Sequence, residues 1–398
     1  MENKWLISIC AGWQQKQSIL NAKSLGFKVI AFDGDINAIS GPLADLFFPI
    51  DIFNHTAIIK KIKQLEIIPT VAVSFISDLG MRSAGIINDY FKTDGMSEEL
   101  SNKLTNKKLQ RICWDALGEF NPEWASIKNS SMKELTSLSK KFNDKVVMVK
   151  PIDAAGSKGI FKINKLSVND INLLKESLKY SRKGEIIIEE YINGREFSVE
   201  SFWSNGNCNI LAVSERIILH DKTASIIMTT NLTYEIDKII KDATIKANLA
   251  LGVRFGLTHT ELIIDKNKKP FLLETAGRGG GFYVFDELVQ KVTGEDYSKI
   301  FIKQLMKQEL VENENKMREV TIKYFPSRLG VIKSISGFEE VNKITGIKAE
   351  CFVKDGDSTN SCLSDADRIG YMLVWGKTRE ERDYLFKKAN SLITIDYY

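Results

Sequence analysis

The sequence predicts an α/β protein that begins with a doubly wound parallel sheet, and three observations support this fold class. Short apolar runs alternate with helical patterns over the first hundred residues. Longer apolar runs follow from Val199 to Leu273, and short strands with glycine punctuation continue to Tyr398. The alternation of strands and helices over the first hundred residues is typical of a parallel sheet with helices on both faces.

The composition is that of an ordinary globular chain with room for two or three domains. The 398 residues are 43% hydrophobic and 27% charged, with a net charge of +4. This excess is too small and too scattered to indicate nucleic acid binding. The 5 cysteines are dispersed without a CxxC pair, so we expect a reducing cytoplasm rather than a disulfide framework. Because no apolar run approaches membrane-spanning length, we expect no membrane association.

The N-terminal elements are short and are bounded by polar or glycine residues. In order, we expect a strand over 5–10, a helix over 14–26, a strand over 28–33, a helix over 56–67 and a strand over 70–75. The turn after the first strand reads CAGWQQK and has one glycine, whereas a dinucleotide site requires GxGxxG. A nicotinamide-dependent oxidoreductase is therefore disfavoured.

The segment KVVMVKPIDAAGSKG (145–159) is the first that indicates chemistry. Its strand delivers Lys150, Pro151 ends the ladder, and the small residues of DAAGSKG follow. A backbone with few side chains lets N–H groups approach phosphate oxygens, and the lysine adds a positive charge. The lysine precedes the glycines, so the segment is not a P-loop. An ordinary hairpin turn with a solvated lysine explains it equally well.

The segment EIIIEEYINGREFSVE (185–200) places two acids, Glu189 and Glu190, at the end of an isoleucine-rich strand. As a hinge between two lobes, such a strand would present backbone groups to an adenine edge. The carboxylate of Glu196, after the Asn193–Gly194 turn, would accept the ribose hydroxyls, because charged acceptors make the stronger hydrogen bonds. A hairpin with a solvated acidic face remains the alternative.

The segment GLTHTELIIDKNKKPFLLETAGRGGG (256–281) predicts a hairpin with a carboxylate on each strand. The turn DKNKKP joins the two strands, which brings Glu261 and Glu274 to one face. Mg²⁺ prefers hard oxygen ligands, usually one or two carboxylates with substrate phosphates. Arg278 and the glycines after it then form a cationic, backbone-lined pocket that suits an anionic substrate or an oxyanion.

The order of these motifs resembles the ATP-grasp superfamily, in particular its carboxylate–amine ligase branch with a biotin-carboxylase-like C-terminal part. The resemblance covers nearly the whole chain and implies an α+β ATP-grasp architecture. It implies a pre-ATP-grasp α/β domain over 1–104 and a two-lobed ATP-grasp domain over 105–310, with a mobile lid at about 128–190. A small C-terminal α+β domain would cover 311–398.

The resemblance also implies roles for individual residues. The ATP-binding residues would be Lys107, Lys150, Gly156, Ser157, Gly159, Glu189, Glu190, Ile192 and Glu196. Glu261 and Glu274 would bind Mg²⁺, with Mn²⁺ as the alternative ion. Lys150 and Arg278 would act in catalysis, and the expected substrate contacts are His220, Lys222, His259, Arg278 and Gly280. The family signature E-x-N-x-R appears at 274–278, with Ala276 where the family often has an asparagine ligand.

Two further expectations concern single residue types. His259 lies two residues before Glu261, so strand alternation places both on one face. A substrate contact and a structural histidine both remain open there. No basic stripe accompanies the tryptophans, so we expect them in the core rather than on a stacking platform; they are Trp13, Trp114, Trp124, Trp203 and Trp375.

The function implied by the resemblance is an ATP-dependent ligase. It would activate a small-molecule carboxylate as an acylphosphate, join it to an amine, and release ADP and phosphate. A homodimer remains open, because in many relatives the C-terminal domain contributes to dimerisation. One alternative keeps the fold but makes the chain a carboxylase or a formate-activating enzyme of nucleotide biosynthesis. An alternative of another class is a non-catalytic, nucleotide-binding regulatory protein.

Overall fold

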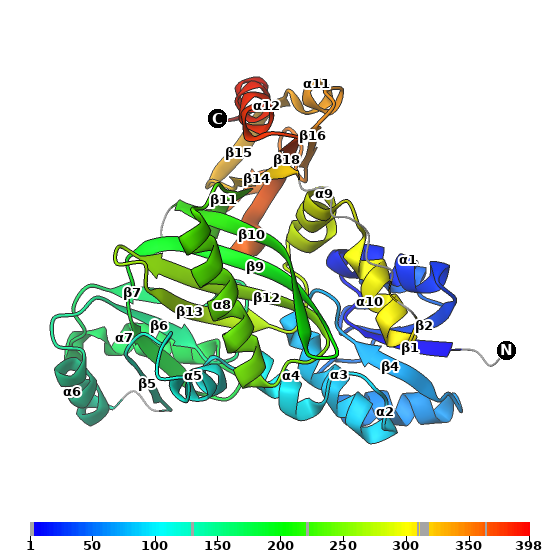
Figure 1. Ribbon diagram of the computed structural model, residues 1–398, viewed down its shortest axis with the longest axis horizontal. Coiled ribbons are helices and arrows are strands. Elements are labelled where there is room, and N and C mark those ends of the chain that lie inside the picture. The colour runs from blue at the N-terminus through cyan, green and yellow to red at the C-terminus, as the bar shows by residue number, and fades with distance from the viewer. Residues whose placement is uncertain (1–3, 129–130, 220–222, 309, 311–317, 363) are drawn as a thin grey trace.

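The computed structural model describes residues 4–128, 131–219, 223–308, 310, 318–362 and 364–398 (Figure 1). The expected substrate contacts His220 and Lys222 therefore lie outside the described residues. Within them, no helix is long and apolar enough to cross a membrane.

The N-terminal part is a parallel four-stranded sheet with the order β3-β2-β1-β4. Side chains alternate between its faces: Leu6 packs with residues of the first helix, whereas Ile7 packs with those of the next two. Helices thus cover both faces, which confirms the predicted doubly wound sheet. The elements are β1 (Lys4–Ile9), α1 (Lys16–Ser24), β2 (Phe27–Phe32), β3 (Leu46–Phe48), α2 (His55–Gln64), β4 (Pro69–Val73), α3 (Asp78–Phe91) and α4 (Glu98–Leu104).

An antiparallel four-stranded sheet, which we call the lid sheet, follows with the order β5-β8-β6-β7. Leu135 and Leu174, from the two helices above it, pack on the buried strand residues Val147, Val149 and Ile188. One helix leads into this part. The elements are α5 (Lys107–Asp115), β5 (Trp124–Ile127), α6 (Met132–Lys141), β6 (Val147–Pro151), β7 (Phe161–Ile163), α7 (Ile171–Lys179) and β8 (Ile186–Glu190).

The largest sheet has eight strands in the order β13-β12-β9-β10-β11-β14-β18-β16. Long helix α8 crosses one face (Figure 1), where its residues Ile240 and Leu251 pack with the fully buried Trp114 and Trp203. The elements of its first part are β9 (Gly194–Ser204), β10 (Asn207–Leu219), β11 (Thr223–Thr229), α8 (Tyr234–Leu251), β12 (Gly256–Asp265), β13 (Pro270–Ala276), the π-helix η4 (Val284–Val289), α9 (Gln290–Thr293) and α10 (Tyr297–Leu305).

The C-terminal part contributes β14, β18 and β16 to this sheet, because β11 pairs with β14. A small sheet, β17-β15-β19, lies beyond it. The elements are β14 (Glu319–Pro326), β15 (Gly330–Ser336), α11 (Phe338–Asn342), β16 (Ile347–Cys351), β17 (Ser358–Thr359), β18 (Arg368–Gly376), α12 (Arg379–Leu392) and β19 (Thr394–Tyr397). Short 3-10 turns are η1 (Trp13–Gln15), η2 (Gly41–Leu43), η3 (Val168–Asp170) and η5 (Asp365–Asp367).

The expectation that the tryptophans are core residues is wrong for Trp13. Its side chain is 40% exposed, whereas Trp114 and Trp203 are fully buried. Trp13 lies in a 3-10 turn at the mouth of a large cavity, where its ring contacts those of Phe282 and Tyr283. The residue is therefore half-covered by the wall of a site rather than by the core.

Candidate active site

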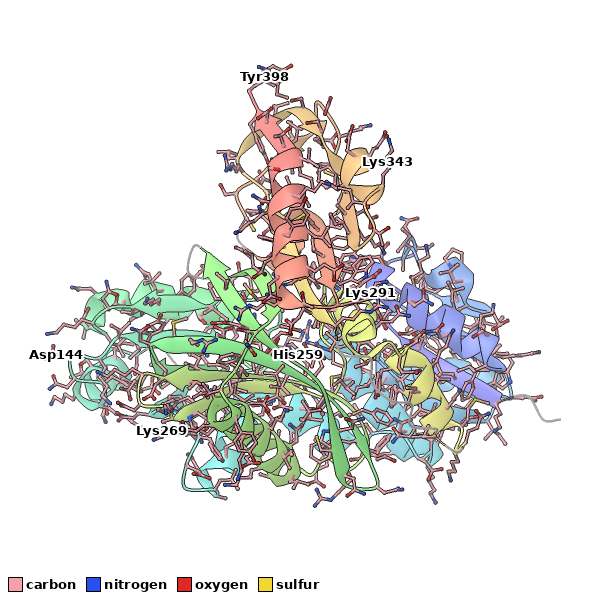
Figure 2. All side chains as sticks on the ribbon, turned by 45° about the horizontal axis from the view of Figure 1, so that its top comes forward. Asp144, His259, Lys269, Lys291, Lys343 and Tyr398 are labelled. Carbon is pink, nitrogen blue, oxygen red and sulfur yellow. The ribbon has the colours of Figure 1, made fainter. Side chains whose placement is uncertain are left out.

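A cavity of about 960 Å³ lies where the N-terminal part, the lid sheet, the large sheet and the C-terminal part meet. Figure 2 places His259, one of its lining residues, near the centre of the molecule. Of the expected site residues that the structure describes, all line this cavity except Gly159 and Gly280, which support its walls. Segments separated by more than two hundred residues thus meet at one place.

The predicted hairpin with a carboxylate on each strand is confirmed. Strands β12 and β13 are antiparallel, and their register pairs Glu261 directly with Glu274. The register shifts immediately after this pair, so the bulge lies beside the two acids. Both carboxylates line the cavity, which places them on the same face as the sequence pattern predicts.

Each of these carboxylates is balanced by a cation. Lys107 Nζ lies 2.7 Å from Glu274 Oε2, and Glu261 contacts Arg216. Burial alone would raise the pKa of Glu274, but Lys107 outweighs it and lowers the pKa to about 2. Glu274 is therefore ionised at neutral pH. The sequence pattern did not indicate Arg216, because its partners lie on other strands.

The two acids fit a magnesium site of the kind that substrate phosphates complete. They offer hard oxygen ligands inside a wide cavity, and Glu274 is ionised. Among the described residues no group of three or more His, Cys, Asp or Glu side chains could hold a metal by itself. The protein alone would therefore leave most coordination positions to phosphate oxygens or water, as Mg²⁺ commonly requires.

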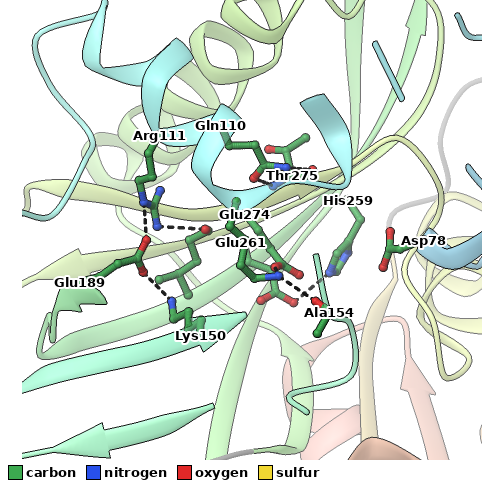
Figure 3. A network of polar contacts seen from close by, with 12 residues as sticks. Asp78, Gln110, Arg111, Lys150, Ala154, Glu189, His259, Glu261, Glu274 and Thr275 are labelled. Carbon is green, nitrogen blue, oxygen red and sulfur yellow. Dashed lines mark hydrogen bonds and ion pairs between the residues drawn. The ribbon is translucent and has the colours of Figure 1, made fainter. Parts of the chain in front are cut away.

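Lys150 is fixed by a buried carboxylate (Figure 3). Its Nζ lies 2.8 Å from Glu189 Oε2, and Arg111 Nε lies 2.5 Å from Glu189 Oε1. Burial would raise the pKa of Glu189, but Arg111 and Lys150 together lower it to about 2. Arg111 also donates to the carbonyl of Leu273, 3.1 Å away, beside Glu274. The Glu189 side chain therefore orients Lys150. Any contact of this residue with an adenine base would have to come from its backbone groups.

The strand end after Glu189 has the polarity expected of a hinge. The N–H groups of Glu190 and Tyr191 donate to the carbonyls of Glu123 and Val146 at 2.8 Å. Within the described residues, the N–H of Ile192 has no acceptor. Further along, the expected ribose acceptor Glu196 lies 3.3 Å from Arg216 Nε. Through Arg216, Glu196 is linked to Glu261.

The loop DAAGSKG has the backbone geometry that its composition predicts. Gly156, Ser157 and Gly159 have φ angles of 67°, 61° and 71°, a region that favours glycine. A side chain on Gly159 would come within 2.9 Å of Pro151, and its carbonyl accepts from Ser177 Oγ at 2.7 Å. Gly159 thus anchors the loop, while Gly156 and Ser157 face the cavity.

Arg278 is held by an acid from the other end of the chain. Its Nε and Nη2 lie 2.9 and 2.5 Å from the two oxygens of Asp78, the first residue of α3. Its Nη1 donates to the carbonyl of Gly279 at 2.8 Å. Burial would lower the pKa of Arg278, but Asp78 outweighs this and raises it. The two residues are 200 positions apart, so local sequence patterns did not reveal the pair.

A second buried acid, Glu200, organises the centre of the site. His259 Nδ1 contacts Glu200, and His259 Nε2 lies 3.1 Å from Glu261 Oε1. The expected common face of His259 and Glu261 is confirmed. Glu200 also accepts from the N–H of Gly280 at 3.0 Å, and a side chain on Gly280 would approach this carboxylate to 2.6 Å. Position 280 therefore requires glycine, because any larger residue would collide with the Glu200 carboxylate.

The wall opposite the lid has an unusual backbone. Phe282 and Tyr283 have φ angles of 51° and 67°, which non-glycine residues rarely adopt. The N–H of Phe282 donates to Gln14 Oε1 at 3.0 Å, and its carbonyl accepts from the Tyr324 hydroxyl at 2.6 Å. The N-terminal and C-terminal parts thus both hold this turn, and such strain is common at ligand-binding sites.

Comparison with known families identifies this architecture. A family model for the ATP-grasp domain matches residues 143–286, and a model for the L-amino acid ligase C-terminal domain 2 matches residues 323–398. Residues 143–286 therefore correspond to an ATP-grasp domain. This match contains the lid loop, the hinge and the hairpin with Glu261 and Glu274.

Curated relatives resemble part of this chain. Alanine–anticapsin ligase of Bacillus subtilis is 26% identical over 254 residues, 56% of this chain and 49% of the relative. The formate-dependent phosphoribosylglycinamide formyltransferase of Prochlorococcus marinus is 29% identical over 202 residues, 48% of each chain. The chain thus spans about half the length of the curated relatives that it matches.

A solved structure resembles the chain over its full length. The L-amino acid ligase from Bacillus licheniformis matches with a TM-score of 0.84 at 20% identity, covering 100% of both chains. This likeness establishes the fold, including the C-terminal extension of the large sheet.

Proposed function

We propose that this ATP-grasp protein is an ATP-dependent ligase that joins a small-molecule carboxylate, such as an amino acid, to an amine and releases ADP and phosphate. The observation that carries the proposal is the direct pairing of Glu261 with Glu274 inside the large cavity. Lys107 is paired with Glu274, Lys150 lies on the lid strand β6, and Arg278 is paired with Asp78 of α3. The partial match to alanine–anticapsin ligase supports this class of reaction.

In this proposal ATP lies between the lid sheet and the large sheet. Lys150, oriented by Glu189, and Lys107 would contact phosphate oxygens, and the loop with Gly156 and Ser157 would cover them. The backbone groups of Glu190 and Ile192 would contact the adenine, and Glu196 would accept the ribose hydroxyls. Gly159 would hold the lid loop in place.

Glu261 and Glu274 would hold Mg²⁺, with Mn²⁺ as the alternative. When bound, the ion would neutralise phosphate charge during transfer. Ala276 lies opposite His259 in the hairpin and offers no ligand at the position where relatives often have asparagine. The protein ligands of the ion would therefore be these two glutamates.

The substrate carboxylate would lie between the metal acids and Arg278. It would accept the γ-phosphoryl group as an acylphosphate, and the amine nitrogen would then displace phosphate from the acyl carbon. Arg278 and backbone N–H groups would stabilise the oxyanion, with His259 and Gly280 beside it. Positioning and electrostatics dominate such transfers, so no separate nucleophile is needed. The lid would exclude water from the acylphosphate.

The partial match to a formate-dependent formyltransferase favours one rival reaction. In it the same site would activate formate or bicarbonate instead of an amino acid. A screen of amino acid pairs, formate and bicarbonate, with ADP and phosphate measured and products identified by mass spectrometry, separates the two. We expect substrate-dependent ADP release with a new amide product. Turnover with formate or bicarbonate alone would favour the rival, and a complete lack of turnover would favour a regulatory protein.

A further inference from the structure

A second, smaller cavity of about 200 Å³ lies on the other side of the Lys107–Glu274 ion pair from the adenine hinge. Both cavities share Lys107, Glu274 and Ala154, and Lys107 Nζ donates to the Ala154 carbonyl at 3.0 Å. Figure 3 shows Glu274 and Ala154 close together, with Gln110 and Thr275 above them in this view. The inner end of the small cavity therefore adjoins the place where phosphoryl transfer is proposed.

The mouth of this cavity is a seam between the lid part and the N-terminal part. Arg182, at the lid side, lies over the ring of Phe53 with its guanidinium carbon 3.8 Å from the centroid. Lys183 Nζ lies 2.8 Å from Asn102 Oδ1. These contacts cross the seam, so the cavity is present while the lid rests against the N-terminal part.

Two cations, Arg182 and Lys183, line the mouth of the cavity beside one acid, Asp153. Both oxygens of Asp153 accept hydrogen bonds, from Ser181 Oγ at 2.8 Å and from the Lys183 N–H at 3.0 Å. Among the described residues, the side chains of Arg182 and Lys183 contact the Phe53 ring and the Asn102 amide rather than a carboxylate. Burial, and then the nearby Arg82, lowers the pKa of Lys183. The charges of Asp153, Glu185 and Glu98 act on Lys183 in the opposite direction, so these acids offset part of the positive charge at the mouth.

The inner acids of the cavity are already neutralised. Glu274 is paired with Lys107, and Asp78 is paired with Arg278. Between them and the mouth, the lining includes the amide of Gln110, which is committed to the backbone of Thr275 at 2.7 and 3.0 Å. A small anion that moves from Glu274 toward the mouth would therefore pass the polar lining around Gln110 before it reaches Arg182 and Lys183.

We propose that this side cavity binds the inorganic phosphate that the reaction forms and releases it while the lid still covers the nucleotide. This rests on the proposed function, because only an ADP-forming reaction frees phosphate beside Glu274. A phosphate ion suits the cavity by its size and charge, whereas the larger cavity holds the hinge, the lid loop and the aromatic wall. Arg182 and Lys183 are its proposed anion contacts.

The test measures phosphate binding without turnover. The full chain is saturated with Mg·ADP, and radiolabelled inorganic phosphate is titrated by equilibrium dialysis. Lys183→Gln and Arg182→Gln should each weaken phosphate binding about two- to fivefold, the usual range for one exposed charge pair, and the double variant should lose more. The matched control is Lys179→Gln, because Lys179 is exposed on α7 and is paired with Glu176. It should bind phosphate like the parent.

Each other result overturns the proposal. The proposed phosphate site is refuted if phosphate does not bind to the parent. It is also refuted if phosphate binds to Lys183→Gln and Arg182→Gln as tightly as to the parent. An equal loss in Lys179→Gln indicates a general charge effect. Weaker ADP binding with unchanged phosphate binding would assign Lys183 to the nucleotide's phosphates instead. A parent that never releases ADP with any substrate refutes the proposed function, and that failure is visible separately from the dialysis.

Discussion

The two ends of the large cavity are built in different ways. At the lid end, the buried carboxylate of Glu189 joins Lys150 and Arg111, which lie 39 and 78 positions away. At the opposite end, Asp78 reaches Arg278 from 200 residues away, and Gln14 and Tyr324 hold the turn at Phe282 from two other parts of the chain. The first end is an electrostatic cluster, and the second is a meeting point of several segments.

This difference predicts separate consequences for mutations. Changes at the lid end should alter stability, nucleotide affinity and all ATP-dependent activity together, because buried charges lose their partners. Changes at the opposite end should alter the use of carboxylate and amine substrates while ATP binding persists. Glu274 lies between the two ends. Its loss should abolish ATP-dependent turnover, to which both ends contribute.

Glu274→Gln should therefore have the largest effect. Removing one metal carboxylate takes away several kcal/mol of charge stabilisation, so ADP formation should fall by at least about a thousandfold. The measurement is substrate-dependent ADP release, with melting temperature to confirm folding. Glu176→Gln, on the exposed face of α7, is the control and should be active. Activity of Glu274→Gln within tenfold of the parent would contradict the metal role.

Glu189→Gln should mainly affect stability at the lid end. It leaves Lys150 and Arg111 buried without their carboxylate, which should cost about 3–5 kcal/mol at neutral pH. The pKa of Glu189 is lowered from 4.5 to about 2 in the folded chain. Its stabilisation is thus present above pH 4.5 and is lost as the pH falls toward 2.

Melting temperatures of the parent and Glu189→Gln between pH 7 and pH 2 check this sign. The parent should lose stability steeply below pH 4.5, and the variant should show a shallower loss over that window. Parallel curves for the two proteins would mean that Glu189 is not the acid that titrates.

Arg278→Lys tests the opposite end. Lysine keeps the charge but loses the planar fork that grips Asp78, so it is not a conservative change. Ligation should fall about a hundredfold, the scale for losing one oxyanion donor, while ATP affinity is retained. Asp78→Asn should shift the same observable in the same direction. Normal turnover of Arg278→Lys with only a lower melting temperature would show that the pair merely anchors the loop.

The smallest expected effect comes from Tyr324→Phe. It removes the hydroxyl that donates to the Phe282 carbonyl at 2.6 Å, a hydrogen bond worth roughly 0.5–1.5 kcal/mol. The KM for the carboxylate or amine should rise about two- to tenfold, with the KM for ATP unchanged. Tyr371→Phe is the matched control, because the Tyr371 hydroxyl has no partner among the described residues. An equal change in both variants would argue against the role of the turn.

The same contrast explains what the sequence could predict. Glu261 and Glu274 lie on adjacent strands joined by a short turn, so alternation and hairpin geometry were enough to place them on one face. His259 followed from the same periodicity. Asp78, Glu200, Arg111 and Arg216 were missed, because their partners are distant in sequence and no local pattern marks a buried acid that orients a cation. The positive φ of Phe282 and Tyr283 was equally hidden, because both are residue types that rarely adopt it.

The exposed position of Trp13 belongs to this second group. Its hydrophobicity favours the core, but the residue lines a cavity that exists only where four parts of the chain meet. The local pattern of Trp13 therefore carried no information about its surroundings.

The measurement that tests the central claim most directly follows the oxygen of the substrate carboxylate. A carboxylate substrate found by the screen is labelled with ¹⁸O, and the reaction products are analysed by mass spectrometry. An acylphosphate formed between Glu274 and Arg278 loses its phosphate with one carboxylate oxygen, so one ¹⁸O atom should appear in inorganic phosphate for each amide formed. Label in AMP, or amide formation without label in phosphate, would contradict the account.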